Sequence, residues 1–180
     1  MGLLHQARIP LQVDIGFGDV VTPGPERVEF PTLLGAPAPQ LLAYPRYTMV
    51  AEKLETMLRL GMANSRMKDF YDVWLLSRLF EFDGRTLCEA VRNTFRRRST
   101  PLPGGLPMVF TDEFRKDAQK QTQWRAFVRK SRPENVSGDV DAVLGDVAAF
   151  LMPVMEAARG DEHFELLWPQ GGPWGETTRE

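Results

Sequence analysis

The chain has 180 residues, of which 43% are hydrophobic and 26% are charged, and its formal net charge at pH 7 is -2. These values lie near the averages for globular proteins, so they argue against a disordered chain and against a membrane protein. The length suffices for one domain with a hydrophobic core, or for a small sheet followed by a helical domain.

The sequence shows neither a targeting signal nor the cysteines needed for an internal disulfide. No apolar run approaches the roughly 20 residues that span a bilayer, and the N-terminus lacks the charged start and long apolar stretch of a signal peptide. The single cysteine, Cys88, can form neither an internal disulfide nor, by itself, a zinc site. We therefore expect a cytoplasmic protein without membrane contact, with Cys88 packed in the core rather than serving as a reactive thiol.

The charge is distributed unevenly along the chain. Residues 92–132 contain eleven Arg or Lys against three acids, whereas residues 134–180 contain ten acids against two arginines. This split indicates either a surface for an anionic partner or two helices that pair with each other. The aromatic residues of the basic block, Phe95, Trp124 and Phe127, could stack on nucleic-acid bases, but their spacing is more typical of a buried helix face.

The first part of the chain predicts strands and loops. Residues 9–17 alternate apolar and non-apolar side chains, which predicts a half-buried strand with Asp14 on its polar face. The segment 21–45 contains six prolines and several glycines, so long helices are excluded there. Within it we expect two short strands, near residues 27–30 and 40–43.

Helical periodicity begins after Pro45 and dominates the rest of the chain. The expected helices cover approximately residues 46–62, 66–82, 83–97, 111–129 and 137–158. Asn64 and Ser65 are suited to cap the second of them. The segment 101–107 is rich in Pro and Gly and is the best candidate for a linker, and residues 161–180 are expected to form an irregular tail.

Four charged residues are candidates for chemistry. Asp14, fixed on a strand, could bind Mg²⁺ or accept a proton from an attacking hydroxyl, or it could simply face solvent. Lys53, one turn into a helix, could present its charge to a triphosphate or lie on the surface. Asp69 and Asp72 share one face near a helix N-terminus, where the helix dipole stabilises carboxylates whether or not they have a function.

Three ordered motifs make the functional reading more specific. They are D-I-G-F-G-D at residues 14–19, A-E-K at residues 51–53, and R-x-K-D-x-x-D at residues 66–72. Each motif alone would be weak, but together they agree in kind and spacing with one family. Over residues 8–76 the chain resembles the AbiEii/AbiGii nucleotidyltransferase toxins of type IV toxin–antitoxin systems.

The resemblance implies a fold and an activity. The fold would be α+β and mostly helical, with a partial polymerase-β-like nucleotidyltransferase sheet at residues 1–45, a helical bundle at residues 46–160, and the irregular tail at residues 161–180. Such enzymes transfer a nucleotide from an NTP to an acceptor, with Mg²⁺ holding the triphosphate. The acceptor would be the 3′ end of a tRNA or another RNA, although a protein acceptor is also open, and an antitoxin would restrain the enzyme.

The resemblance also assigns roles to individual residues. Asp14 and Asp69 would be catalytic, and Asp14 would act as a metal ligand or as the base. Lys53, Lys68 and Asp72 would bind the nucleotide, with Lys53 contacting the NTP phosphates and the two aspartates of the third motif ordering the site.

The sequence departs from the family pattern in one large respect. Before the D-I-G-F-G-D strand the family has a G-G-T-A-L helix start and a D-x-D strand that supplies two metal-binding carboxylates, and neither precedes Asp14 here. Because two-metal catalysis needs that pair, we expect an incomplete or inactive form that uses Mg²⁺ only if it is active. A truncated gene, a short form that lost catalysis, and an N-terminal half supplied by a second chain are all compatible with this pattern.

Two other interpretations compete with an enzyme. The chain could be a non-catalytic helical binding module that engages an antitoxin, an RNA or a second copy of itself, and an unpaired sheet edge would favour such a partner or a homodimer. Alternatively, it could be a helical structural domain in which Lys53 and Asp69 form an ordinary ion pair between adjacent helices. An enzyme requires a nucleotide site, whereas neither alternative does.

Overall fold

The computed structural model describes residues 2–4, 7–10, 12, 18–133, 136–160 and 163–176. Over these residues the fold is α+β and mostly helical, as predicted. The α-helices are α1 (Arg46–Leu60), α2 (Met67–Leu79), α3 (Gly84–Arg97), α4 (Asp112–Arg115), α5 (Ala118–Ser131) and α6 (Val140–Gly160). Two short 3-10 helices, η1 (Gly61–Ala63) and η2 (Met108–Phe110), precede α2 and α4.

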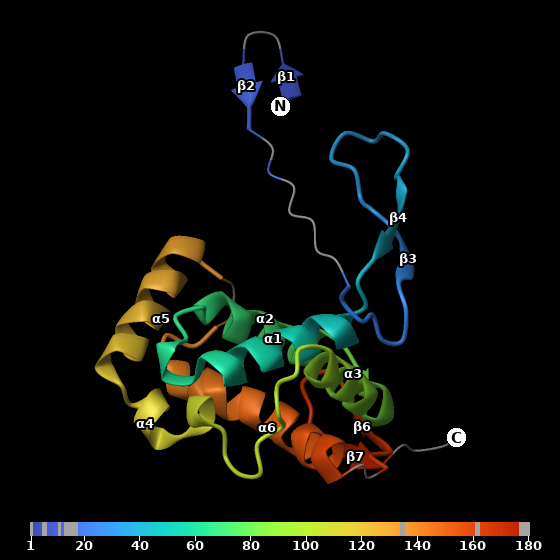
Figure 1. Ribbon diagram of the computed structural model, residues 1–180. Coiled ribbons are helices and arrows are strands. Elements are labelled where there is room, and N and C mark those ends of the chain that lie inside the picture. Colours follow the sequence, from blue (N-terminus) through green and yellow to red (C-terminus); the bar gives the residue numbers. More distant parts are fainter. Residues whose placement is uncertain are drawn as a thin grey trace.

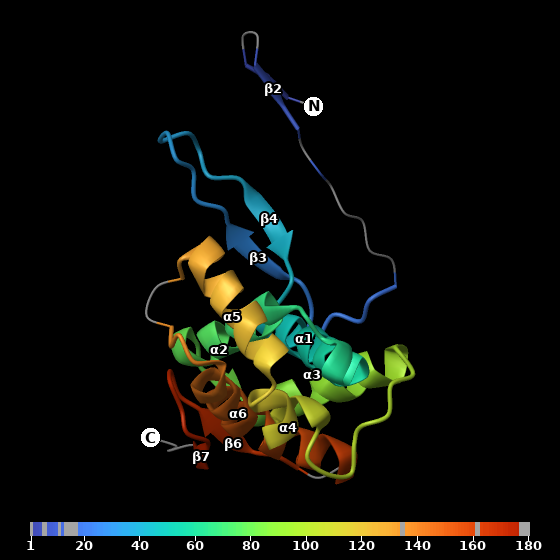
Figure 2. The same cartoon turned by 90° about the vertical axis from the view of Figure 1, so that its left-hand side faces the viewer.

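The described strands are short and form three small antiparallel sheets. The sheets consist of β1 (Gly2–Leu4) with β2 (Ala7–Ile9), β3 (Glu26–Glu29) with β4 (Gln40–Ala43), and β5 (Phe82–Asp83) with β6 (Leu166–Trp168) and β7 (Gly175–Glu176). Both views of the molecule show the two hairpins, β1–β2 and β3–β4, projecting from the same side of the helical body (Figures 1 and 2). The two short strands predicted near residues 27–30 and 40–43 are therefore confirmed, to within one residue.

The predicted strand over residues 9–17 falls largely outside the described part of the chain. Ile9 ends β2, and Pro10 and Gln12 have no regular secondary structure. Residues 11 and 13–17, which include Asp14, are not described. The partial nucleotidyltransferase sheet and the domain boundaries therefore remain predictions.

The hydrophobic core is built around α6. This helix lies against α2 and α3 on the side away from the hairpins (Figures 1 and 2). Its fully or almost fully buried residues recur at spacings of three and four: Val140, Val143, Leu144, Val147, Phe150, Leu151, Val154 and Met155. Each such side chain stabilises the fold by about 1.5–3 kcal/mol relative to leaving it exposed. Helix α1 then packs against α3 and α2 and completes the helical body.

One predicted helix is broken in the structure. The pattern over residues 111–129 predicts a continuous helix, whereas α4 ends at Arg115 and α5 begins at Ala118. The reason is the side chain of Asp117, which accepts a hydrogen bond from the backbone N–H of Lys120 at 2.9 Å and caps α5. An aspartate that bonds the backbone in this way favours a new helix start over continuation. The loop at residues 101–107 is confirmed, and helices on both sides of it share one core.

The C-terminal segment, expected to be irregular, is anchored on the core. Trp168 in β6 donates from Nε1 to the backbone oxygen of Ser77 at 2.7 Å, and Trp174 donates from Nε1 to that of Phe150 at 2.8 Å. The Phe150 ring contacts both tryptophan rings, at centroid distances of 4.9 and 5.7 Å. Tryptophan combines a large apolar surface with one donor, so two of them suffice to order a chain that lacks helical periodicity.

Replacing Gly84 by alanine is expected to destabilise the protein by about 1–3 kcal/mol, because overpacking of this kind forces neighbouring atoms to move. A Cβ at this position would lie 2.5 Å from Cδ1 of Phe164 and 2.7 Å from the backbone oxygen of Leu166. Urea denaturation would measure the change. Gly105→Ala is the matched control, since a Cβ there meets nothing within 4 Å. Equal stabilities of the two variants would contradict the packing described for the start of α3.

Candidate functional site

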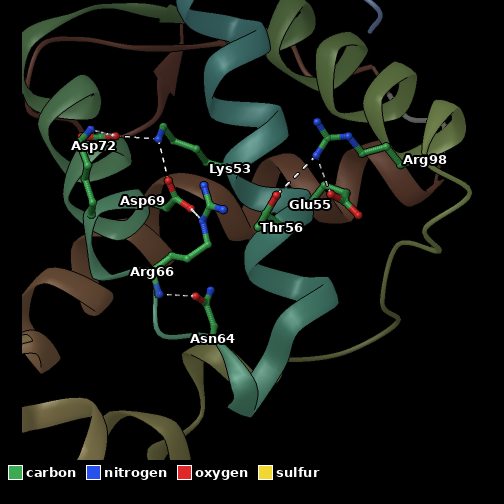
Figure 3. A network of polar contacts seen from close by, with 9 residues as sticks. Lys53, Glu55, Thr56, Asn64, Arg66, Asp69, Asp72 and Arg98 are labelled. Carbon is green, nitrogen blue, oxygen red and sulfur yellow. Dashed lines mark hydrogen bonds and ion pairs between the residues drawn. The ribbon is translucent and has the colours of Figure 1, made fainter. Parts of the chain in front are cut away.

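A partly buried ion cluster joins α1 to the first two turns of α2. The Lys53 ammonium on α1 donates to Oδ1 of Asp69 at 2.8 Å and to Oδ2 of Asp72 at 2.6 Å (Figure 3). The exposed fractions of the three side chains are 19%, 6% and 17%. The i, i+3 spacing of the aspartates places both carboxylates on the face of α2 that meets α1. The ion pair between Lys53 and Asp69, which was expected only under the structural-domain alternative, is therefore present.

Two further cations complete this group, which we call the Lys53 cluster: Lys53, Arg66, Lys68, Asp69 and Asp72. Arg66 donates from Nε to Oδ2 of Asp69 at 2.6 Å, and the Lys68 ammonium donates to both oxygens of Asp72, at 2.9 and 2.6 Å. Both flanking cations are largely exposed, at 62% and 71%. With three cations and two carboxylates, the cluster has a formal charge of +1 and presents its cations to solvent.

The electrostatics of the cluster keep its central pair ionised. Burial by itself would lower the pKa of Lys53, but its hydrogen bonds to Asp69 and Asp72 and the charges of these carboxylates outweigh burial, so the pKa lies above its ordinary value. Burial would likewise raise the pKa of Asp69, but the hydrogen bonds from Lys53 and Arg66 hold that pKa below its usual range. The pair therefore stays charged at neutral pH.

The turn before α2 fixes where the aspartates lie. Asn64, fully buried, accepts a hydrogen bond at Oδ1 from the backbone N–H of Arg66 at 2.8 Å. The backbone oxygen of Asn64 accepts from the ammonium of Lys120, a buried residue of α5, also at 2.8 Å. The capping predicted for Asn64 and Ser65 is only partly correct, because the cap position is Arg66 and has no side-chain cap. Asn64 instead turns the chain into the helix.

A second polar network lies on the opposite side of α1 (Figure 3). Glu55, fully buried, accepts from Nη1 of Arg98 at 2.8 Å, from the hydroxyl of Thr100 at 2.7 Å and from Nε of Arg59 at 3.1 Å. Burial would raise the pKa of Glu55, but the hydrogen bonds from Arg98 and Thr100 hold it below its ordinary value. Burial also raises the pKa of Glu52, which lies 3.5 Å from Nη2 of Arg98. We call Asp19, Glu52, Glu55 and Arg98 the Arg98 network.

Sequence reasoning missed the Arg98 network. The one available signal was the i, i+3 spacing of Glu52 and Glu55, which puts two acids on one helix face opposite the basic end of α3. The network matters because Nη2 of Arg98 also lies 3.9 Å from Asp19, the last residue of the first motif. Arg98 thus links α1 to the last residue of the first motif on one side of the helix, and Lys53 links α1 to the third motif on the other.

The predicted site residues are partly brought together. The structure brings four of them into one cluster: Lys53, Lys68, Asp69 and Asp72. From the sequence, only the shared helix face of Asp69 and Asp72 was expected. Asp14 lies outside the described residues and is therefore not placed relative to the cluster. The catalytic and nucleotide-binding roles of all five residues remain predictions.

Comparison with known families identifies the chain. A family model described as "Nucleotidyl transferase AbiEii toxin, Type IV TA system" matches residues 2–146, a span that contains both networks. The chain belongs to the AbiEii family. The resemblance drawn from the three motifs is thereby confirmed, and the chain is a nucleotidyltransferase-type toxin of that family. Comparisons with curated proteins and with solved structures give no match.

Membership of the AbiEii family raises the question of a metal. Among the described residues, no three Asp, Glu, His or Cys side chains are grouped so as to hold an ion. Both oxygens of Asp69 and of Asp72 already accept from cations, which leaves none directed at an empty position. The described residues therefore do not fit a resident Mg²⁺.

Two other features of the AbiEii chain bear on its expected properties. No helix in the described ranges combines the length and apolar character needed to cross a bilayer. Two aromatic residues of the basic block face the core, with Trp124 fully buried and Phe95 at 2% exposure, so these two are not available to stack on bases. The prediction of core packing is correct for both.

Cys88 is expected to resist alkylation in the folded protein. It is buried, its Sγ donates to the backbone oxygen of Val154 at 3.4 Å, and burial raises the pKa of its thiol to about 11, with Arg92 opposing the shift. At pH 8 the reaction with iodoacetamide should be roughly 100-fold slower than that of an exposed cysteine, because the thiolate is the reacting form. Mass spectrometry of native and urea-unfolded protein would measure the two rates. Equal rates would contradict the burial.

Proposed function

We propose that this AbiEii chain holds an NTP at the Lys53 cluster, as the nucleotide-binding side of a transferase that modifies an acceptor such as tRNA. The supporting observation is that two of the three family motifs meet there through Lys53, Asp69 and Asp72 at hydrogen-bonding distance. Lys53 would contact the triphosphate, and the exposed Lys68 would add a second cation. Asp69 would orient Lys53 during the reaction.

The cluster suits an exchange of anions. The raised pKa of Lys53 keeps its ammonium charged, so a phosphate oxygen could replace one of the two carboxylates as its partner without a proton transfer. Asp72 is the partner more easily released, because its side chain is 17% exposed whereas that of Asp69 is 6% exposed. Asp69 would then continue to hold the ammonium in place. Asp14 is proposed as the carboxylate that accepts the proton of the attacking hydroxyl or binds the ion that accompanies the NTP.

A basic surface on α5 supports an RNA acceptor. Arg125 and Arg129 lie one turn apart on α5 and are exposed, as are Lys130 and Arg132, the residue that caps the helix C-terminus. Within the described ranges none of these four side chains forms an ion pair, and α5 itself contains no acidic residue. Cations that form no ion pair within the described ranges, gathered towards one end of a helix, suit the phosphates of a nucleic acid. The α5 helix packs on α2, where the Tyr71 and Phe127 rings lie 5.6 Å apart, so this surface adjoins the helix that carries the cluster.

We propose further that residues 1–180 by themselves are an incomplete or inactive form. No D-x-D pair precedes Asp14 in this sequence, and two-metal transfer depends on such a pair. An antitoxin is the expected protein partner because the family belongs to a type IV toxin–antitoxin system. Because NTP, tRNA and antitoxin would all have to reach the chain, the same proposal implies that the protein acts in the cytoplasm.

A non-catalytic binding module is the second candidate. It is favoured by one observation, which is that all three charged groups at the centre of the Lys53 cluster already satisfy one another, as in a structural contact between helices. In that case the chain would engage an antitoxin, an RNA or a second copy of itself, and the cluster would only join α1 to α2.

Radiolabelled NTPs separate these possibilities. Each of the four α-labelled NTPs would be incubated with the chain and Mg²⁺, first alone and then with a tRNA pool. The proposal predicts retention of label on the protein and slow or absent transfer to tRNA. Transfer that is rapid and requires Lys53 would overturn the inactive form, while absence of retention for all four NTPs would overturn the nucleotide site and favour the binding module.

A further inference from the structure

A buried lysine on α5 lies outside both the Lys53 cluster and the basic surface of its own helix. Lys120, in the first turn of α5, is 3% exposed, and its ammonium lies 5.2 Å from the centre of the Phe114 ring. Within the described part of the chain it forms no ion pair. Burial of a cation without a carboxylate partner is costly, so a lysine at this position needs a reason other than packing.

The ammonium of Lys120 is directed at the turn between η1 and α2. It donates to the backbone oxygen of Asn64, the residue that ends η1, at 2.8 Å. Asn64 is fully buried, and its Nδ2 has no hydrogen-bond partner among the described residues. Two groups that are costly to bury therefore meet at this turn. Local departures of this kind from a well-satisfied core are expected at functional sites.

The turn leads directly to the Lys53 cluster (Figure 3). Oδ1 of Asn64 accepts from the backbone N–H of Arg66 at 2.8 Å, and the Arg66 side chain donates from Nε to Oδ2 of Asp69 at 2.6 Å. The other oxygen of Asp69 accepts from the Lys53 ammonium at 2.8 Å. Because Arg66 caps α2 without a side-chain hydrogen bond of its own, the contact with Asn64 fixes the start of the helix that carries Asp69.

We propose that Lys120 is a positioning residue, which holds the Asn64 turn against α5 and so keeps Asp69 in place to orient the Lys53 ammonium. This inference rests on the proposed function, because it gives the contact a purpose at the nucleotide site. Lys120 acts through the turn, since its contacts are with Asn64 and Phe114 and not with the cluster itself. Helix α5 therefore supports the nucleotide site as well as carrying the proposed acceptor surface.

A purely structural contact is the alternative. A lysine that donates to the last carbonyl groups of a helix is a common way to satisfy them, and Asn64 follows the last residue of η1. In that case Lys120 would contribute to the stability of the whole domain. Its loss would leave the ion pair between Lys53 and Asp69 unchanged in the molecules that remain folded. The two interpretations therefore differ in what they predict for Lys53.

The reactivity of the Lys53 amine tests the proposal without any nucleotide. Lys120→Met removes the ammonium but keeps an unbranched apolar side chain. Brief acetylation at pH 8 followed by mass spectrometry of peptides gives the rate at Lys53 relative to exposed Lys116 in the same molecule. Lys53 is protected in the wild type, because only the uncharged amine reacts and its carboxylate partners raise its pKa. Displacement of Asp69 should raise the relative rate about two- to tenfold, as expected for loss of one hydrogen bond. An unchanged relative rate would overturn the proposal.

Hydrogen exchange separates a local effect from a general loss of stability. The amides of Phe70 and Tyr71 are the first in α2 that can bond within the helix, so they report on its start. In Lys120→Met they should exchange about two- to tenfold faster, and the buried face of α6 should be affected less. Equal acceleration in α2 and α6 would show that Lys120 only stabilises the domain, and would contradict a positioning role.

Asn64→Ala carries the same test if Lys120→Met lacks a cooperative urea transition. It removes the side-chain bond to Arg66 but leaves the backbone oxygen that Lys120 uses. This variant should also raise the acetylation rate of Lys53 relative to Lys116. A rate equal to that of the wild type would show that the turn does not position the ion pair, and the proposal would fail.

Nucleotide titration links the contact to the proposed function. Lys120→Met should weaken NTP·Mg²⁺ binding about two- to tenfold, the range for one hydrogen bond, whereas Lys116→Met should leave it unchanged. Equal affinities of wild type and Lys120→Met would overturn the positioning role at the nucleotide site. If the wild-type chain binds no NTP, the proposed function fails, but the acetylation rate of Lys53 still decides whether Lys120 positions the ion pair.

Discussion

Arg98→Met is expected to lower the free energy of unfolding by about 3–5 kcal/mol, the usual result of removing one partner from a buried ion pair. Glu55 is fully buried and would lose its 2.8 Å contact with the guanidinium, keeping only the hydroxyl of Thr100 and the more exposed Arg59. Urea denaturation at pH 7 would measure the loss. The control is Arg96→Met, because Arg96 is exposed and forms no ion pair within the described ranges. This substitution should change the free energy of unfolding by less than about 0.5 kcal/mol.

The double variant Glu55→Leu/Arg98→Met sharpens this prediction. Replacing both partners by apolar residues also removes the buried charge that Arg98→Met leaves without its main partner, so it should recover part of the loss seen with Arg98→Met alone. A double variant that is less stable than the single one would show that burial of the Glu55 charge is not the cause.

Acidification should weaken the contact between Glu55 and Arg98. The pKa of Glu55 lies below its ordinary 4.5, so the stability that this carboxylate contributes is present above pH 4.5 and is lost as the pH falls through its folded-state value. In Arg98→Met the same carboxylate would lose the interaction that lowers its pKa. The stability difference between wild type and variant should therefore shrink on acidification below pH 4.5, and a difference that grows would contradict this account.

Lys53→Met is expected to have the second large effect, on stability and on nucleotide binding together. Asp69, only 6% exposed, would retain Arg66, and Asp72 would retain Lys68, so we expect a loss of about 2–3 kcal/mol, smaller than for an unpaired buried charge. Nucleotide binding should weaken at least about tenfold, because a charge-assisted bond to a phosphate is worth about 1.5–3 kcal/mol. Thermal or urea unfolding and nucleotide titration would measure the two effects separately.

The pH range of the Lys53 contact follows from the two pKa shifts. The pKa of Lys53 is raised, so its contribution is complete below 10.5 and is lost as the pH rises through the folded-state value. The pKa of Asp69 is lowered, so its contribution is present above 3.8 and is lost as the pH falls through the folded-state value. The cost of Lys53→Met should therefore be nearly constant from about pH 5 to pH 9.5. A strong dependence on pH within that range would contradict the ion pair.

The helices and the family could be predicted from the sequence because their signals are local. The apolar spacing of α1, α2, α3 and α6 is continuous over many residues, and the three motifs are short runs in a fixed order. The break between α4 and α5 was not predicted, since a single aspartate, Asp117, outweighs the periodicity on both sides of it. The strands near the C-terminus were not predicted because they depend on the distant contacts of Trp168 with Ser77 and Phe150.

The candidate site was only half accessible to sequence reasoning. The shared face of Asp69 and Asp72 follows from helix geometry, but their meeting with Lys53 depends on how α1 and α2 pack. The Arg98 network draws on three separate parts of the chain, Asp19, α1 and the end of α3, and carries no local pattern that distinguishes it from surface charge. Glu55 illustrates the difficulty, since a glutamate in an amphipathic helix is ordinarily exposed and here is fully buried.

The measurement that tests the central claim most directly is calorimetric titration of the chain with ATP, CTP, GTP and UTP in Mg²⁺, with Lys53→Met and Lys116→Met run in parallel. Lys116 is the matched control because it forms an exposed ion pair with Asp112 within one helical turn, far from the cluster in sequence. The nucleotide site predicts binding of at least one NTP that is weakened at least about tenfold by Lys53→Met and unchanged by Lys116→Met. No binding of any NTP, or equal weakening by both substitutions, would contradict it.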